Sequence, residues 1–489
     1  MPHSTIDVFA PAHVLLKALQ EGSISASALL ELYLERIARY NPQLKAIVVL
    51  NEERARQQAW DADRARTRGT LSACSLHGLP ITVKDCLEVA GLPSTMGLPE
   101  RANSLSMQNG PVVQSLLSAG GVLLGKTNVS PYAGDWHAHN KLFGRTDNPW
   151  DAKRTPGGST GGGAAALAAG LTPLEYGGDI GGSIRIPASF CGIYGHRPSE
   201  TLVPRYGYVP GPSLPNPAIV MGVQGPLARS AADLKLGLKV IAGPSVGEDV
   251  AWQLQLPPPR HQRLSEFRVA VLPPVDWLPV DHEITEALEN LVIELRKRGV
   301  IVAQVQPESF DLREHEEVYT SLMQAITYAD LDEQARALQV EWVRHRGGPF
   351  SDAELLGLTA TASQLFALLS KREQYRAIYR DFFKQWDVLL TPVTITYAFE
   401  HINPHIPFAS RKLSINGEVV PYAFMKVYPG LATLSGQPAT AFPWGRSKTG
   451  LPLGLQVIGP YLEDYTPITF AELLEREFGG FVAPQSYLR

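Results

Sequence analysis

Two serines lie in glycine-rich surroundings near the middle of the chain, Ser159 in PGGSTGG and Ser183 in GGDIGGSIRIP. Acyl transfer needs an activated oxygen nucleophile and hydrogen-bond donors aimed at the oxyanion that forms during attack. Two glycines before a serine permit a tight turn in which consecutive backbone N–H groups converge beside the hydroxyl. The run 180–183 is therefore a candidate for both the nucleophile and the loop that stabilises the oxyanion.

The base for such a serine is the next question. No histidine lies in a comparable glycine-bounded motif, whereas Lys84 follows the apolar segment LPITV. Burial lowers the pKa of a lysine and favours the neutral, proton-accepting amine. Ser–Lys pairs are a known variant of the catalytic triad. Taken alone, an ordinary lysine at a strand end is the simpler interpretation of Lys84, so its assignment depends on the rest of the pattern.

One other motif suggests a different chemistry. The segment 120–127, GGVLLGKT, matches the phosphate-loop pattern GxxxxGK[ST]. That mechanism needs a strand, a glycine-rich loop and then a helix whose N-terminus faces the phosphates. Here VLL itself is typical of a strand, and Pro131 and Gly134 disfavour a helix after it. Nucleotide binding is therefore not expected.

The segment 157–161, GGSTG, matches the GxSxG nucleophile elbow of α/β-hydrolases. An elbow follows a hydrophobic strand directly, but the preceding residues DAKRTP are charged and interrupted by proline. An α/β-hydrolase-like esterase with Ser159 as nucleophile is thus an alternative to the first interpretation. His137 and His139 form one HxH pair without a third ligand in view, so neither a metal site nor a cofactor is predicted.

The composition limits the class of protein. Of the 489 residues, 44% are hydrophobic and 19% charged, which excludes a disordered chain, and the net charge of -4 does not favour nucleic acid as a partner. The cysteines Cys74, Cys86 and Cys191 lack CxxC spacing, which argues for a reducing compartment and against a disulfide framework. The first residues resemble no signal peptide, and no stretch reaches the length of a membrane span. We expect a soluble, cytoplasmic protein.

Hydrophobic periodicity predicts alternating helices and strands. The glycine-rich segment (residues 154–198) contains an AAALAA helix and buried isoleucines, unlike a flexible linker. The helical segment (residues 311–386) is rich in aromatic residues and follows a βαβ-like unit. We expect helices at 27–40, 51–68, within 110–127 and at 282–298, with strands at 45–50, 79–83, 122–124, 267–272, 300–305, 386–393 and 451–460. Asn41 and Pro42 are expected to end the first helix.

These motifs together resemble the amidase-signature family, over roughly residues 10–475. The resemblance is carried by GLPITVKD (78–85), FGRTDNPWD (143–151), the whole of 154–198, GPLARSAADL (225–234), DVLLTPV (387–393) and LSGQPAT…GLPLGLQVIGP (434–460). It implies one large α/β domain over 1–489, with a mixed, twisted central sheet covered by helices on both faces. Within it, 70–235 would form the catalytic core and 258–386 a more variable excursion that shapes the substrate pocket.

The resemblance also implies roles for individual residues. Ser183 becomes the nucleophile, Ser159 a bridging serine after a cis peptide bond, and Lys84 the base that acts through Ser159. The oxyanion hole would consist of the backbone N–H groups of Ile180, Gly181, Gly182 and Ser183. Asp179, Arg185 and Thr160 would support the site, and Ala133 and Ser159 would touch the substrate.

The sequence departs from the family pattern at a few positions. Thr160 replaces the usual second serine, Gly163 the third, and Gly178 stands where threonine or serine is common. The expected activity is hydrolysis of a carboxylic amide C–N bond through an acyl-enzyme, extending to esters or carbamates, by a monomer or homodimer on a small-molecule amide. An amidotransferase component that releases ammonia from glutamine for a partner enzyme is an alternative, as is a binding protein without the chemistry. Tyr319, Met323, Tyr328 and Phe366 are expected to line the acyl pocket, although core packing explains them equally well.

Overall fold

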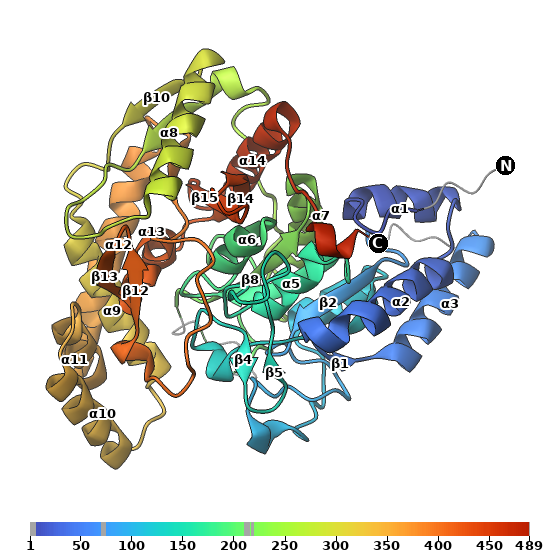
Figure 1. Ribbon diagram of the computed structural model, residues 1–489, viewed down its shortest axis with the longest axis horizontal. Helices are drawn as coiled ribbons and strands as arrows, with labels where there is room; N and C mark the ends of the chain where they lie inside the picture. Colours follow the sequence, from blue (N-terminus) through green and yellow to red (C-terminus); the bar gives the residue numbers. More distant parts are fainter. Residues whose placement is uncertain (1–5, 70–74, 210–215, 217–219, 489) are drawn as a thin grey trace.

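A single mixed sheet of eleven strands organises the molecule (Figure 1). The computed structural model describes residues 6–69, 75–209, 216 and 220–488. The strand order is β1-β3-β2-β6-β8-β7-β14-β15-β11-β9-β10, with parallel pairs at β2–β3, β2–β6, β11–β9 and β9–β10 and antiparallel pairs elsewhere. The strands are β1 (Ile47–Leu50), β2 (Pro80–Lys84), β3 (Val122–Thr127), β6 (Leu174–Asp179), β7 (Tyr194–Arg197), β8 (Val223–Ala228), β9 (Arg268–Val271), β10 (Ile301–Gln304), β11 (Val388–Pro392), β14 (Ala439–Arg446) and β15 (Pro452–Ile458).

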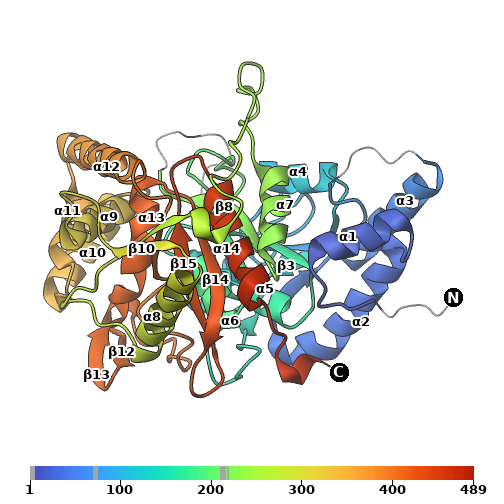
Figure 2. The ribbon, with the colours of Figure 1, turned by 90° about the horizontal axis from the view of Figure 1, so that it is seen from above.

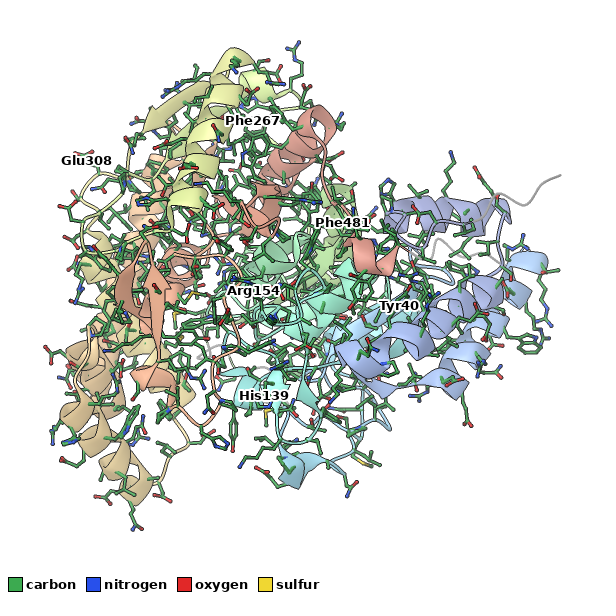
Figure 3. The ribbon with its side chains drawn as sticks, in the orientation of Figure 1. Tyr40, His139, Arg154, Phe267, Glu308 and Phe481 are labelled. Carbon is green, nitrogen blue, oxygen red and sulfur yellow. The ribbon has the colours of Figure 1, made fainter. Side chains whose placement is uncertain are left out.

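Helices cover both faces of this sheet, as the sequence predicts (Figure 2). One hydrophobic core includes residues of α1, α2, α4, α7, α8 and α14, and the other residues of α6, α9, α12 and α13. Phe267, which is labelled in Figure 3, packs edge-on against Phe470 of α14 with ring centroids 5.1 Å apart. The helices are α1 (Ala12–Glu21), α2 (Ala26–Leu44), α3 (Glu52–Thr67), α4 (Pro111–Ser118), α5 (Gly161–Ala168), α6 (Arg185–Cys191), α7 (Ala231–Ile241), α8 (His282–Lys297), α9 (Leu312–Thr327), α10 (Glu333–Arg346), α11 (Ser351–Thr359), α12 (Ala362–Phe382), α13 (Val427–Ser435) and α14 (Tyr465–Phe478).

The two ends of the molecule are built differently. Helices α1–α3 lie at one end and α9–α12 at the other, and the views in Figures 1 and 2 agree on this. Two small hairpins, β4 (His139–Asn140) with β5 (Gly144–Arg145) and β12 (Lys412–Ile415) with β13 (Glu418–Pro421), lie outside the main sheet. The unit β9–α8–β10 is a parallel βαβ unit, and α9–α12 confirm the expected helices.

Two details test the sequence interpretation. Gly125, Lys126 and Thr127 belong to β3, so the phosphate-loop match is part of a strand and no helix follows it directly. Helix α2 continues through Pro42 to Leu44, which corrects the expected end at Asn41–Pro42. The side chain of Leu44 is buried, and this tertiary contact outweighs the local preference against proline in a last turn.

The topology brings the carboxyl ends of two parallel strands together. Strands β2 and β6 are parallel neighbours, with Thr82 opposite Glu175 and Val83 opposite Tyr176. Their carboxyl ends therefore meet at the same edge of the sheet. Lys84 is the last residue of β2, and the loop that carries Ser183 begins directly after β6.

No helix among residues 6–69, 75–209 and 220–488 combines the length and the apolar character needed to cross a membrane.

Candidate active site

Lys84 and Ser159 form the buried part of the site. Lys84 Nζ donates a hydrogen bond to Ser159 Oγ over 2.7 Å, and neither side chain is exposed to solvent. Burial lowers the pKa of Lys84 from its ordinary value. Electrostatic interactions with Cys86, Asp179 and Glu175 raise it, but burial has the larger effect. The structure therefore provides the environment in which a lysine can accept a proton.

The local backbone places Ser159 against Lys84. The Gly158–Ser159 peptide bond is cis, as the family resemblance implies, and Thr160 then begins α5 as its N-cap. A Cβ at Gly158 would lie 2.4 Å from the carbonyl oxygen of His137, so this position needs glycine. Residues 155–158 form no strand, so Ser159 does not follow a strand directly and the geometry of a nucleophile elbow is absent from this described segment.

Ser183 lies in the loop between β6 and α6, and it is the one member of the three that reaches solvent, with 7% of its surface exposed. Its carbonyl oxygen accepts from the Thr160 N–H over 3.1 Å, which ties the loop to α5. Among the described residues no hydrogen bond joins the hydroxyls of Ser159 and Ser183. The structure thus contains the Lys84–Ser159 hydrogen bond, whereas contact between the two serine hydroxyls stays a prediction.

The amides of this loop divide into two sets. The N–H groups of Gly182 and Ile184 donate to the Asp179 carboxylate over 3.2 and 3.1 Å. Those of Ile180, Gly181 and Ser183 have no acceptor among the described residues. Three of the four amides predicted for the oxyanion hole are therefore free to bind an anion, whereas the Gly182 amide already serves Asp179.

Asp179 accepts hydrogen bonds from the loop, and Arg185 holds Asp179 in place. Arg185 donates to both oxygens of the Asp179 carboxylate, over 3.0 and 2.9 Å, and its remaining nitrogen donates to Gln456 over 2.9 Å. Burial alone would raise the pKa of Asp179, but the Arg185 and Arg197 guanidinium groups hold it well below its usual range. The depressed pKa keeps the carboxylate ionised at neutral pH, where its hydrogen bonds order the turn.

Two side chains from outside the loop, Trp136 and Tyr319, donate hydrogen bonds to its backbone, and the sequence assigned no role to Trp136. Trp136 Nε1 donates to the carbonyl oxygen of Gly181 over 2.8 Å. The Tyr319 hydroxyl donates to the carbonyl oxygen of Ile180 over 2.7 Å. Tyr319 was expected to line the acyl pocket; it is instead fully buried against the loop, and no local sequence signal distinguishes it from other tyrosines of the helical segment.

The other expected residues have mixed outcomes. The Thr160 hydroxyl is buried without a hydrogen-bond partner in the described structure, so its expected support of Lys84 is not observed. Ala133 is half-buried and has a positive φ of 54°. Phe366 is 69% exposed, and Tyr328 packs against a separate small cluster around Val343, so neither is part of the main core.

His196, for which the sequence offers no role, is a structural residue. Its ring contacts Thr440 Oγ1 over 2.9 Å and Asp464 Oδ1 over 3.2 Å, and Ser199 also donates to Asp464. His137 is buried, which lowers its pKa to about 4, and packs edge-on against Phe399. Cys86 and Cys191 are free and buried, and Cys74 lies outside the described residues.

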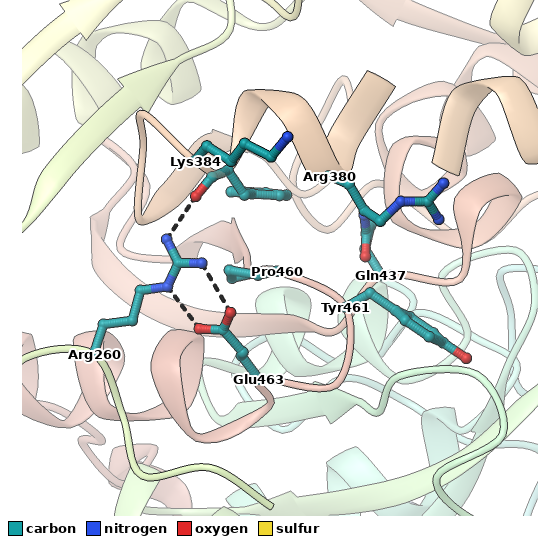
Figure 4. A pocket seen from close by; sticks show the side chains of 8 residues that line it. Arg260, Arg380, Lys384, Gln437, Pro460, Tyr461 and Glu463 are labelled. Carbon is teal, nitrogen blue, oxygen red and sulfur yellow. Dashed lines mark hydrogen bonds and ion pairs between the residues drawn. The ribbon is translucent and has the colours of Figure 1, made fainter. Parts of the chain in front are cut away.

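A surface pocket of about 440 Å³ lies elsewhere, between the end of α12 and the turn after β15 (Figure 4). Arg260 lines one side of it and donates to both oxygens of Glu463 over 2.6 and 2.8 Å. Arg380, Lys384 and Tyr461 also line it, but it contains neither a serine nor a cysteine. It lacks a nucleophile and is separate from the site around Ser183.

Comparison with known proteins identifies the family of the chain. The Amidase family model matches residues 28–467, and the chain therefore belongs to the amidase family, whose members hydrolyse amide C–N bonds. The chain is 32% identical to a glutamyl-tRNA(Gln) amidotransferase component from Protochlamydia amoebophila, with 93% of each chain covered. It is 28% identical to human fatty-acid amide hydrolase 2, covering 97% of this chain and 90% of the relative.

The fold has a solved counterpart in a bacterial aryl acylamidase of the amidase-signature family. The two structures superpose with a TM-score of 0.80 at 24% identity, over 96% of each chain. At this identity the likeness concerns the fold alone. It confirms the expected α/β architecture, in which the strand ends at Lys84 and Asp179 share one edge.

Proposed function

We propose that this chain is an amidase that acts alone, hydrolysing a carboxylic amide through an acyl-enzyme on Ser183. The observation that carries the proposal is the buried hydrogen bond between Lys84 and Ser159 beside a loop with three free amides. A desolvated amine can accept a proton, and free backbone donors can stabilise the oxyanion. Both requirements of acyl transfer meet at one edge of the sheet.

The mechanism follows from these positions. Neutral Lys84 takes the proton of Ser159 as Ser159 takes that of Ser183, and Ser183 Oγ attacks the amide carbonyl carbon. The amides of Ile180, Gly181 and Ser183 bind the oxyanion. The relay then returns the proton to the leaving amine, the C–N bond breaks, and water hydrolyses the ester on Ser183 by the same path.

A fluorophosphonate probe tests the nucleophile. The probe should label the protein once, and peptide mapping should place the label on Ser183 and not on Ser159. Labelling on Ser159, or no labelling of the folded protein, would contradict the proposal. A panel of anilides, fatty amides, primary amides, esters and carbamates would then identify the substrate class.

A second function is favoured by one observation, the identity of 32% with a glutamyl-tRNA(Gln) amidotransferase component. Such a component would release ammonia from glutamine for a partner enzyme. Glutaminase activity should be measured with and without an added amidotransferase partner. Activity on glutamine that depends on the partner would favour this alternative, whereas partner-independent cleavage of other amides favours the amidase.

A further inference from the structure

From the last residue of β6 to Ser183, every backbone carbonyl group accepts a hydrogen bond. Those of Asp179, Ile180 and Gly181 accept from side chains, namely Arg197 Nη1 over 2.8 Å, the Tyr319 hydroxyl over 2.7 Å and Trp136 Nε1 over 2.8 Å. Those of Gly182 and Ser183 accept from the backbone N–H groups of Ile186 and Thr160, over 2.8 and 3.1 Å. Five consecutive carbonyl groups are thus held by donors from five different segments.

This pattern determines where the amides point. In a trans peptide the C=O of one residue and the N–H of the next lie in one plane and face opposite ways. The donor on the Ile180 carbonyl therefore fixes the N–H of Gly181, one of the three free amides. The donor on the Gly181 carbonyl fixes the N–H of Gly182, which serves Asp179.

Given the proposed function, we propose that Tyr319 is a positioning residue for the reaction, whose hydroxyl holds the Ile180–Gly181 peptide so that the Gly181 N–H faces the oxyanion. Gly181 has no Cβ that would restrict the rotation of this peptide. Its surroundings are also open, because an added Cβ would meet nothing closer than the Tyr319 hydroxyl at 3.8 Å. Without the tyrosine hydroxyl, the peptide could rotate and lose the alignment of its N–H.

Tyr319 is itself held in place by its surroundings. On α9, the neighbouring Glu316 is fully buried and forms an ion pair with Lys426 over 2.5 Å, and Lys426 also contacts Thr320. The pair joins α9 to the segment before α13. Gly430 in α13 leaves room for the ring, because a Cβ there would lie 2.9 Å from Tyr319 Cδ1. Tyr319 therefore reaches the loop as a rigid donor.

On this proposal the helical segment contributes to catalysis by positioning the loop. The donor and acceptor are separated by 139 residues of sequence. Removing an oxyanion-hole donor from a hydrolase lowers kcat by about 10²–10³-fold, and misaligning one should cost less. A positioning role predicts a change in kcat, whereas a substrate contact predicts a change in KM.

Tyr319→Phe is the test, since it removes one oxygen and keeps the ring. The full chain and the variant are compared on a p-nitroanilide that the parent cleaves, by the rate of fluorophosphonate labelling, and by the affinity for a trifluoromethyl ketone, which forms a tetrahedral oxyanion. We expect kcat, labelling rate and ketone affinity to fall about 10- to 100-fold while KM changes less than threefold. Unchanged kcat and labelling, or a change confined to KM, would overturn the proposal.

The chain offers a matched control in Tyr379. Its ring is fully buried in the same hydrophobic core, but its hydroxyl has no hydrogen-bond partner among the described residues. Tyr379→Phe should leave all three measurements within twofold of the parent, and a loss equal to that of Tyr319→Phe would count against a specific role for Tyr319.

A second variant, Gly430→Ala, and the labelling of the parent protein complete the test. If Tyr319→Phe does not fold, Gly430→Ala displaces the ring instead, and it should lower kcat in the same way; an unchanged kcat would overturn the proposal. Labelling of the parent at Ser183 separates this inference from the proposed function. A parent that is not labelled refutes the proposed function, whereas a labelled parent with an equally active Tyr319→Phe variant refutes the positioning role alone.

Discussion

The glycine-rich segment and the helical segment differ most in the share of their residues that is buried. Every residue from 155 to 200 is buried except Ile180. In the helical segment, by contrast, α10 buries only Val340 and Val343, and Phe366 of α12 is 69% exposed. In the proposed mechanism the first segment acts through its backbone amides, so it depends on small residues and close packing. The second uses a few buried side chains and tolerates a polar, exposed surface.

The largest effect is expected at the centre of the buried segment. Lys84→Ala and Ser183→Ala should each lower kcat by at least about 10⁴-fold, because in the proposed mechanism Lys84, Ser159 and Ser183 act as a unit. Circular dichroism should show that both variants remain folded. A Lys84→Ala variant with near-parental rates at neutral pH would refute the relay and would make the lysine a structural residue.

Next in size is the loss of the charge that orders the loop. Asp179→Asn leaves the buried Arg185 unpaired and should lower the free energy of unfolding by about 3–5 kcal/mol at neutral pH. Because the native pKa of Asp179 is depressed, its contribution is complete above the unfolded value of 3.8 and is lost as pH falls below it. The difference in the free energy of unfolding between parent and variant, measured with denaturant, should therefore persist at pH 5–7 and shrink below pH 3.8. A difference independent of pH would contradict this account.

A smaller effect is expected from one added methyl group. A Cβ at Gly162 would lie 2.3 Å from the Asn128 backbone nitrogen, so Gly162→Ala should destabilise the protein by about 1–3 kcal/mol. At Gly222 a Cβ would meet nothing within 4 Å, and Gly222→Ala is the control, expected to be close to neutral. Thermal denaturation of both variants compares them; equal stabilities would show that the segment can relax.

The pH profile provides a fourth test. Because burial lowers the pKa of Lys84 below the ordinary 10.5, kcat should rise with pH along a limb that lies below that value. The Tyr208 ring lies 5.6 Å from Lys84 Nζ, and Tyr208→Ala should admit water and move the limb to higher pH. The pKa of Lys84 is raised, against the effect of burial, by three other groups that face it, namely Cys86, Asp179 and Glu175. A limb that stays in place would mean that Tyr208 does not control the hydration of Lys84.

The smallest effect is expected on the exposed face of the helical segment. Phe366→Ser should change the free energy of unfolding by less than about 0.5 kcal/mol and leave kcat unchanged. An altered KM for apolar amides would instead show that Phe366 contacts the substrate, as the sequence first suggested. Steady-state kinetics on short and long acyl chains would distinguish these outcomes.

Local patterns were sufficient to predict much of this molecule. Strand β2, the βαβ unit and helices α3 and α8 agree closely with expectation, because hydrophobic periodicity reports burial directly. Lys84 and Ser159 were expected to lie together, and they do. The family resemblance supplied that expectation, since no local rule pairs residues 75 positions apart.

Long-range contacts could not be predicted in the same way. The sequence predicted neither β6, which leads into the Ser183 loop, nor the contacts of Trp136 and Tyr319 with that loop. Strand β6 contains Gly177 and Gly178, which lower its strand propensity, and tertiary packing forms it nonetheless. Tyr319 and Tyr379 look alike in sequence, and only the fold places one hydroxyl against the loop.

The exposure of Ser183 alone among the three reactive residues has a kinetic consequence. Lys84 and Ser159 are closed to solvent, so on the proposed mechanism we expect water to reach the acyl-enzyme from the side of Ser183, the side from which the amine leaves. The amine product should therefore depart before deacylation begins, which gives ping-pong kinetics. Added hydroxylamine would enter by the same route, compete with water for the ester, and release a hydroxamate in place of the acid.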